Sequence, residues 1–366
     1  MDAALHNPIV CEIAETGPVP FDVFMEKALF SREHGYYQNN RPPGTRGDFF
    51  TAADIGPGLS QLLANQIMKL FRPERGIRII ELGPGSGKVL AGILDIILKN
   101  DPNLFENLEV LSIEKGRSML ESQKKVLHKF ESRISWLELC DMKNSTKPSF
   151  IFGNEFIDAL PVKRFVRKGG KLMEIFVAAR DDGRLEMVEC EADENKNMTI
   201  GQAFSYLPDN CMFESRPGLK DVMGELSRVT GQGVLMLIDY GDEAELLYGP
   251  NRLNGTVRAY EKHRLADPLE NPGSRDITAS VDFTALKNEA VLAGWHPVAC
   301  LSLTKAAMVL GAVEMAAGLA LKSDRDSIRA KMSLMSLVFP RGLGAYFKVF
   351  IADKGMQSGF PTQSKL

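Results

Sequence analysis

A glycine-rich turn, ELGPGSGK at residues 81–88, directly follows a short apolar run and has the composition of a nucleotide-binding loop. A phosphate-binding P-loop needs glycine where Leu82 stands and Ser or Thr where Val89 stands, which excludes that loop. The dinucleotide fingerprint G-x-G-x-x-G is not matched either, because the spacing is G-x-G-x-G. The glycines of the turn are Gly83, Gly85 and Gly87.

Acidic residues near this turn favour a cationic nucleotide ligand. Glu81 would repel a pyrophosphate seated at the next helix N-terminus. It suits a ligand with an amino group, such as S-adenosylmethionine, and the glycines let the backbone approach that ligand closely. Glu114 ends the second apolar run, where an acid accepts hydrogen bonds from ribose hydroxyls. Asp141 follows the third run and is placed to accept a hydrogen bond from an adenine amino group.

A second group of polar residues follows a fourth apolar run in the stretch FIFGNEFIDALPVKRF. Asn154, Glu155 and Asp158 come immediately after the run, and Pro161 prevents a helix from continuing. Paired carboxylates match the planar fork of a guanidinium and would orient it for methyl transfer, with one acid accepting a proton. The structural alternative is that Asn154 caps a turn and Asp158 caps a short helix. Glu155 fits that alternative less well, because burying a carboxylate is costly without a partner.

These residues need a parallel sheet to bring them together. Short apolar strands at 77–82, 108–114, 134–139 and 149–155 alternate with amphipathic helices, a pattern of βαβ units. The predicted fold class is therefore α/β, with a Rossmann-like, mostly parallel sheet whose strand ends share one edge. The final strand, GAYFKVFIAD, alternates as a sheet-edge strand does, and the apolar stretch 306–321 predicts a buried helix.

The domain organisation follows from changes in pattern along the chain. We expect a helical N-terminal extension with a lid-like loop at 1–75 and a main domain at 76–352, followed by a tail at 353–366. The main domain carries insertions at 161–215 and 241–280. Two turn signals, Gly169-Gly170 and Asp182-Gly183, predict an antiparallel β-hairpin within the first insertion.

Composition narrows the class of protein. The 366 residues carry a net charge of −3, which gives no basic footprint for nucleic acid. Five scattered cysteines without a C-x-x-C pair suggest neither a metal site nor a disulfide framework. The N-terminus lacks the basic region of an export signal, and no stretch reaches the roughly 20 apolar residues of a membrane span. We expect a cytoplasmic protein without membrane insertion, and the oligomeric state stays open.

The chain resembles the MidA-like family over residues 18–350. The blocks GYYQNNRPPGTRGDFFTA, ELGPGSG, NEFIDALPV, IDYG, GTVRAY and DITASVDF occur in the family's order. Proteins of this family resemble the mitochondrial protein-arginine methyltransferase that acts in respiratory complex I assembly. The resemblance implies a class I S-adenosylmethionine-dependent methyltransferase fold. It also implies symmetric dimethylation of arginine on a complex I subunit of the 49-kDa type, in a bacterial cytoplasm or an organelle matrix.

The resemblance also implies roles for particular residues. Carried over by position, the cofactor would be held by Glu81, Gly83, Gly85, Gly87, Glu114 and Asn154, and Asp141 joins them as the adenine contact expected from its place after the third run. Catalysis would rest on Asn154, Glu155 and Asp158. The substrate side would include Gly47, Asp48 and Thr51 of the lid-like loop, and Arg258, His263, Asp276 and Thr278.

Two other functions remain open at this point. The chain departs from the family pattern at residues 53–63, 86–88 and 304–309, and these departures affect the lid and the acceptor side more than the cofactor pocket. These departures favour a non-catalytic S-adenosylmethionine-binding assembly factor as one alternative. The other is a methyltransferase for a small molecule, because the sequence has no evident peptide-groove motif.

Overall fold

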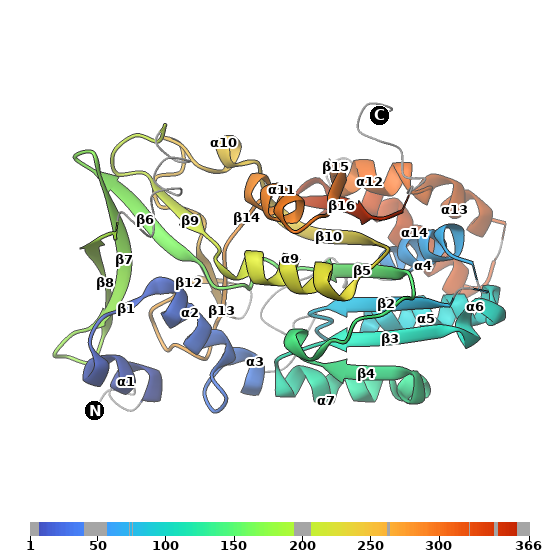
Figure 1. Cartoon of the computed structure of the whole chain (residues 1–366), viewed down its shortest axis with the longest axis horizontal. Helices are drawn as coiled ribbons and strands as arrows, with labels where there is room; N and C mark the ends of the chain where they lie inside the picture. The colour runs from blue at the N-terminus through green and yellow to red at the C-terminus, as the bar shows by residue number, and fades with distance from the viewer. Residues whose placement is uncertain are drawn as a thin grey trace.

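The computed structural model describes residues 7–39, 57–72, 74, 76–193, 206–261, 264–321, 323–339 and 343–356. They form two lobes that lie side by side (Figure 1). We call them the sheet lobe and the second lobe. In the part of the chain described, no helix is long and apolar enough to span a bilayer.

The sheet lobe is built on an eight-stranded sheet. Its strands run in the order β15-β16-β10-β5-β2-β3-β4, and β14 pairs with β10. All neighbours are parallel except β16, which is antiparallel to both β10 and β15. The strands are β2 (Ile77–Leu82), β3 (Leu108–Ile113), β4 (Ile134–Leu137), β5 (Ser149–Asn154), β10 (Gly233–Asp242), β14 (Val281–Asp282), β15 (His296–Ser302) and β16 (Phe347–Lys354). The strand order reverses beside β2, so the ends of β2 and β5 flank the switch point at which such sheets bind ligands.

Helices cover both faces of this sheet. One apolar cluster joins the sheet to α4, α5, α12, α13 and α14, and a second joins it to α9 and α11. The helices are α4 (Gly58–Leu70), α5 (Lys88–Asn100), α6 (Pro102–Glu106), α7 (Arg117–Val126), α9 (Gly218–Val229), α10 (Ala244–Leu247), α11 (Phe283–Leu292), α12 (Leu303–Val309), α13 (Ala312–Leu319) and α14 (Arg325–Val338), with 3-10 turns η4 (His128–Arg133), η5 (Leu139–Asp141) and η6 (Leu343–Ala345). Every residue of β2 is buried, as a strand covered on both faces requires.

The second lobe combines segments that are far apart in the sequence. A five-stranded antiparallel sheet runs β1-β7-β6-β9, with β8 paired to β7, and a three-stranded sheet runs β12-β11-β13. The elements are α1 (Pro8–Thr16), β1 (Val19–Pro20), α2 (Phe21–Phe30), α3 (Tyr36–Asn39), β6 (Lys163–Lys168), β7 (Lys171–Ala179), β8 (Leu185–Glu191), β9 (Met212–Ser215), β11 (Arg258–Glu261), β12 (Arg264–Ala266) and β13 (Asp276–Thr278). One apolar cluster contains residues of helices α1, α2 and α3 and of strands β7, β11 and β13.

The predicted α/β class, the mostly parallel sheet and the antiparallel hairpin insertion are confirmed. Two finer predictions are wrong. β16 is an interior strand with a nearly continuous buried run, and β15 forms the edge. The stretch 306–321 is divided between α12 and α13, because Gly311 adopts a left-handed conformation with φ of 91°. Helix α4, which the sequence pattern groups with the N-terminal extension, packs in the core of the sheet lobe against α5 and α14.

Candidate active site

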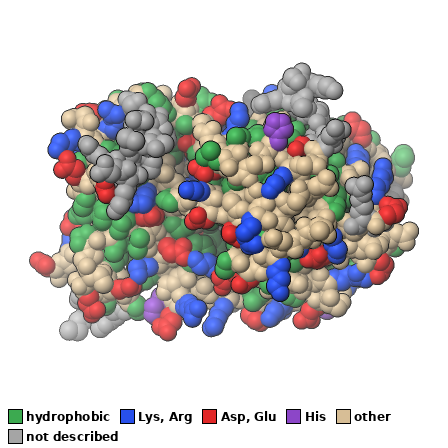
Figure 2. Space-filling model, in the orientation of Figure 1, with side chains coloured by type: hydrophobic (Ala, Val, Ile, Leu, Met, Phe, Trp, Pro, Cys, Tyr) green, Lys and Arg blue, Asp and Glu red, His purple; other side chains and the backbone are tan. Residues whose placement is uncertain are grey.

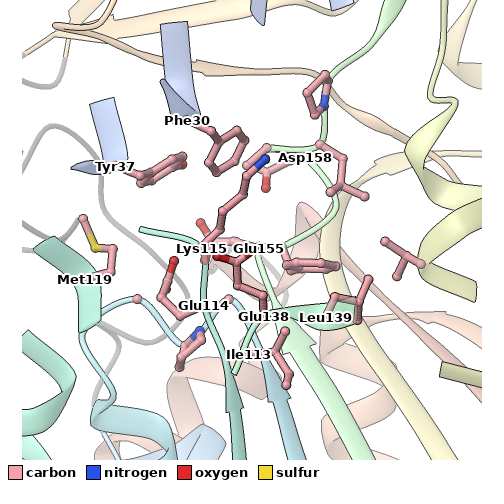
Figure 3. Close-up of a pocket in the computed structure, with 18 of the residues that line it drawn as sticks. Phe30, Tyr37, Ile113, Glu114, Lys115, Met119, Glu138, Leu139, Glu155 and Asp158 are labelled. Atoms are coloured by element: carbon pink, nitrogen blue, oxygen red, sulfur yellow. The ribbon is translucent and has the colours of Figure 1, made fainter. Parts of the chain in front are cut away.

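A cavity of about 460 Å³ lies where the two lobes meet. The face shown in Figure 2 is hollowed near its middle, with acidic side chains beside the hollow. Phe30 and Tyr37 lie on one side of the cavity, and Ile113, Glu114, Glu138 and Leu139 lie on the other (Figure 3). Eight of the described lining residues are acidic and one, Lys115, is basic.

The glycine turn after β2 forms part of the cavity wall. Gly83 and Gly85 line it with φ of 57° and 51°, a conformation that favours glycine. A Cβ on Gly85 would meet no atom within 4 Å, so the missing side chain leaves room for a ligand. A Cβ on Gly83 would lie 2.9 Å from the Phe156 ring, so this glycine is needed for packing as well. Gly87 does not line the cavity and instead precedes α5 with φ of 76°.

Glu114 lies at the end of β3 and lines the cavity. Its Oε1 accepts a hydrogen bond from Gly116 N at 2.7 Å, and its Oε2 accepts one from Gln123 Nε2 at 3.0 Å. Burial raises the pKa of Glu114 to about 7, although these hydrogen bonds act in the opposite direction. Each carboxylate oxygen has a second lone pair, so the group can still accept from a ligand.

Glu81 lies behind the glycine turn and does not line the cavity. Its side chain is 2% exposed, and its Oε2 accepts no hydrogen bond from the described residues. Burial, followed by the nearby charge of Glu114, raises the pKa of Glu81 to about 8. A buried carboxyl oxygen without a partner needs explanation, and a cationic group near this strand end would supply one.

The structure does not bring Asp141 into the cavity. The third strand ends at Leu137, and Asp141 is exposed at the end of η5. The residues just before it, Glu138, Leu139 and Cys140, line the cavity in its place. The third strand is shorter than predicted, because the sequence shows an apolar run but not where its last strand residue lies; the adenine contact of Asp141 stays a prediction.

Asn154, Glu155 and Asp158 are brought together beside the end of β5. Asn154 Nδ2 donates to Glu155 Oε1 at 3.1 Å, and Glu155 has a left-handed φ of 52°. The cost of burying a carboxylate falls mainly on Asp158, which is 4% exposed, and less on the half-buried Glu155. Asp158 lies in an irregular loop and does not begin a helix.

Asp158 is more buried than Glu155, and its Oδ1 accepts no hydrogen bond from the described residues. Burial raises its pKa, whereas the nearby Tyr240 hydroxyl and Arg216 guanidinium lower it. Asp158 lines the cavity, and a buried carboxyl oxygen without a partner is suited to accept a hydrogen bond from a bound group.

The substrate-side predictions divide into three groups. Asp276 and Thr278 of β13 are buried and line the cavity. Arg258 is exposed on β11 and does not line it. The remaining residues lie outside the described part of the chain: Gly47, Asp48, Thr51 and His263.

Residues of α2 and α3 cover the cavity, although sequence reasoning did not identify them. The Tyr37 hydroxyl donates to Asp276 Oδ1 at 2.8 Å, and burial followed by the Asp276 charge raises the pKa of Tyr37 well above its usual value. The Tyr37 and Phe30 rings stack at 5.4 Å, and Lys115 Nζ lies 4.8 Å from the Phe30 ring centre and pairs with Glu26. The sequence feature that could have identified this cover is the aromatic pair in HGYYQNN. The glycine and asparagines around the pair indicate only a loop.

The strand order and the ligand-sized cavity at the switch point define a class I methyltransferase fold. A family described as "Putative S-adenosyl-L-methionine-dependent methyltransferase" matches residues 59–300, and the chain belongs to it. The predicted family, fold and S-adenosylmethionine cofactor are thereby confirmed.

Individual relatives agree with this assignment. The chain is 25% identical to the Drosophila melanogaster protein arginine methyltransferase NDUFAF7 homolog, mitochondrial, over 96% of this chain and 85% of that one. It is 27% identical to the Homo sapiens protein arginine methyltransferase NDUFAF7, mitochondrial, over 77% and 68%. A Burkholderia thailandensis structure bound to S-adenosyl-homocysteine has the same fold, with a TM-score of 0.84 at 23% identity, covering 98% of this chain and 96% of that one.

Proposed function

We propose that this protein transfers the methyl group of S-adenosylmethionine to a guanidinium nitrogen of arginine in a protein substrate. The observation that carries the proposal is the charge of the cavity, with eight acidic lining residues and one basic residue. A strongly acidic wall attracts a cationic acceptor and disfavours an anionic one.

The residues on the cofactor side fit S-adenosylmethionine. Gly85 leaves open space beside the turn, Glu114 presents a carboxylate to the cavity, and the buried Glu81 has an oxygen without a partner among the described residues. We assign Gly83, Gly85 and Glu114 to the cofactor directly, and Glu81 to the electrostatics of its amino group. The apolar Ile113, Leu139 and Phe156 would cover the adenine ring.

On the acceptor side, Glu155, Asp158 and Asp276 would hold the guanidinium. Bound S-adenosylmethionine supplies an electrophilic methyl group on a sulfonium. Any two of these three carboxylates can fix the plane of the guanidinium. Alignment of the attacking nitrogen then supplies much of the acceleration. As the new N–C bond forms and the S–C bond breaks, the nitrogen must lose a proton. Asp158 is our candidate to accept it, because it lines the cavity and burial raises its pKa.

We further propose which protein carries the acceptor arginine. The named relatives are protein arginine methyltransferases of mitochondria. Together with the family resemblance, they support symmetric dimethylation of a complex I subunit of the 49-kDa type. The mitochondrial relatives support an organelle matrix as the compartment, and the family resemblance supports a bacterial cytoplasm as the alternative.

Transfer from labelled S-adenosylmethionine to paired peptides tests the proposal. One peptide carries a single arginine and its matched control carries lysine at that position, in an otherwise identical sequence. We expect label on the arginine peptide alone, and a loss of roughly 100-fold in Asp158→Asn if that residue accepts the proton.

The outcomes separate the three candidate functions. Label on lysine, or on small amines but neither peptide, would contradict arginine specificity. Saturable cofactor binding without transfer to the arginine peptide or to a complex I subunit would favour the non-catalytic assembly factor.

A further inference from the structure

The loop that carries the acceptor-side residues has no regular secondary structure of its own. Residues 155–161 leave the end of β5 and provide six of the residues that line the cavity. Within the loop, one backbone hydrogen bond joins Leu160 N to Ile157 O at 3.0 Å. The position of the loop therefore depends on groups from other elements.

Asp239, near the end of β10, lies beneath this loop and is 1% exposed. Its Oδ2 accepts hydrogen bonds from Ile157 N at 2.9 Å and Asp158 N at 3.2 Å, and its Oδ1 accepts one from Tyr240 N at 2.9 Å. Burying a carboxylate is costly unless it is paired, and two of these three bonds are made to the acceptor loop. Asp239 does not itself line the cavity.

Arg216, just after β9, holds the same loop from another side. Its Nε donates to Leu160 O at 3.2 Å, and its Nη2 donates to Ala279 O at 2.8 Å. Ala279 directly follows Thr278, and Ala279 N donates to Asp158 O at 3.0 Å. The rigid guanidinium thus connects the acceptor loop to the β13 wall, which a flexible lysine ammonium would do poorly.

We propose that Asp239 and Arg216 are positioning residues, which fix the Glu155–Asp158 loop against β13 so that the acceptor is aligned for methyl transfer. The inference rests on the proposed function for its activity readout. It applies to residues that touch neither the cofactor nor the acceptor, since neither lines the cavity.

We call the hydrogen bonds of Asp239 and Arg216 with the acceptor loop the clamp. Amide hydrogen exchange tests the clamp without any catalytic assay. In Asp239→Ala we expect the Ile157 and Asp158 amides to exchange at least about tenfold faster, since their acceptor has been removed. Asp242→Ala is the matched control: Asp242 lies on the same strand and pairs with Lys348 at 2.6 Å, but it does not contact the loop. These two amides should exchange at the wild-type rate in the control.

The activity assay then separates positioning from general support of the sheet. In Asp239→Ala we expect acceptor kcat/KM to fall roughly 100-fold, as misalignment of about 1 Å can cause. The dissociation constant for S-adenosyl-homocysteine should change much less than kcat/KM, because the cofactor wall on β2 and β3 is untouched and only Phe156 of that wall lies in the displaced loop. Asp239→Asn keeps one oxygen for the loop and should recover part of the loss. Arg216→Lys keeps the positive charge but loses the planar guanidinium with its several N–H donors. This variant should also lower kcat/KM and leave the cofactor affinity nearly unchanged.

Unchanged exchange of both amides in a folded Asp239→Ala would overturn the clamp, as would cofactor affinity falling in parallel with kcat/KM. If Asp239→Ala does not fold, Asp239→Asn and Arg216→Lys are judged by the same two criteria. If wild type transfers no methyl group to arginine while the amides behave as expected, the proposed function fails and the clamp stands.

Discussion

Glu155 has a left-handed backbone conformation, with φ of 52°, at the point where β5 enters the acceptor loop. Such conformations cost about 1–3 kcal/mol in residues other than glycine and collect at functional sites. The sequence indicated that Glu155 and Asp158 belong to one site, because both follow the same apolar run. It indicated Glu155 as the buried carboxylate, whereas the fold buries Asp158, because burial depends on Asp239 and Arg216, whose partners in the loop lie 81 and 56 residues away in the chain.

Glu81 should make the stability of the ligand-free protein depend on pH. Its pKa is about 8 when folded, against an ordinary value of 4.5, so between these values the folded protein holds a proton that the unfolded chain has released. The free energy of unfolding therefore falls as pH rises from about 5 to 8, by about 1.4 kcal/mol per unit for this group. Glu114 acts in the same direction up to about pH 7.

Glu81→Gln should remove its share of this slope and be more stable than wild type at about pH 7.5, where the wild-type carboxyl has lost most of this stabilisation. Denaturant unfolding at several pH values measures both effects. Glu121→Gln, at an exposed position on α7, is the control and should keep the wild-type slope. If the free energy of unfolding changes with pH equally in Glu81→Gln and in wild type, the result would contradict a raised pKa of Glu81.

Gly85 and Gly169 form a matched pair for testing the cofactor side. Both have left-handed φ, 51° and 55°, and a Cβ added at either would meet no atom within 4 Å. Alanine at either site should cost about 1 kcal/mol of stability from backbone strain. Gly85→Ala should in addition weaken S-adenosyl-homocysteine binding by roughly tenfold, or about 1.4 kcal/mol, whereas Gly169→Ala should not. Calorimetric titration measures the difference, and equal affinities would remove Gly85 from the cofactor site.

At the scale of elements, α3 connects the cofactor loop to the acceptor wall. Gln38 Nε2 donates to Lys115 O at 3.2 Å, and Gln38 Oε1 accepts from Arg117 N at 3.0 Å. Tyr37, beside it, reaches β13 through Asp276. One short helix thus contacts the segment after Glu114 and the opposite side of the cavity.

Gln38→Ala should therefore weaken cofactor binding although Gln38 does not line the cavity. We expect the dissociation constant for S-adenosyl-homocysteine to rise roughly threefold to tenfold, since two hydrogen bonds worth about 1 kcal/mol together hold the loop next to Glu114. Glu15→Ala, at an exposed position on α1, should have no effect. Equal affinities in the two variants would show that α3 does not position this loop.

The central strands were predictable because local pattern determines them. β2 is buried throughout, and its neighbours β3 and β5 are nearly so, which gives continuous apolar runs in the sequence. The same runs located Glu81 and Glu114 at strand ends. Tyr37 was not predictable as a cavity residue, because its partner Asp276 lies 239 residues further along the chain. Its local sequence contains nothing that specifies such a contact.

At the scale of the whole molecule, a ligand held between the lobes should stabilise both of them. At about a hundred times its dissociation constant, S-adenosyl-homocysteine should raise the free energy of unfolding by about 2.7 kcal/mol. Amide exchange should slow in β2 and in β7 together, because Tyr37 and Asp276 join the second lobe to the cavity. Glu114→Ala should reduce both effects at the same ligand concentration. Protection confined to the sheet lobe would show that the lobes unfold independently.

The second lobe draws its core from helices α1, α2 and α3 near the N-terminus, from β7 in the middle of the chain, and from β11 and β13 about a hundred residues later. On a ribosome that adds about 5–20 residues per second, Phe21 and Phe24 emerge roughly 10–50 s before Ile277. During that interval the aromatic side chains that finally become fully buried lack the part of their core that β11 and β13 contribute. We therefore expect the nascent N-terminus to bind chaperones that shield apolar segments until β13 has been synthesised.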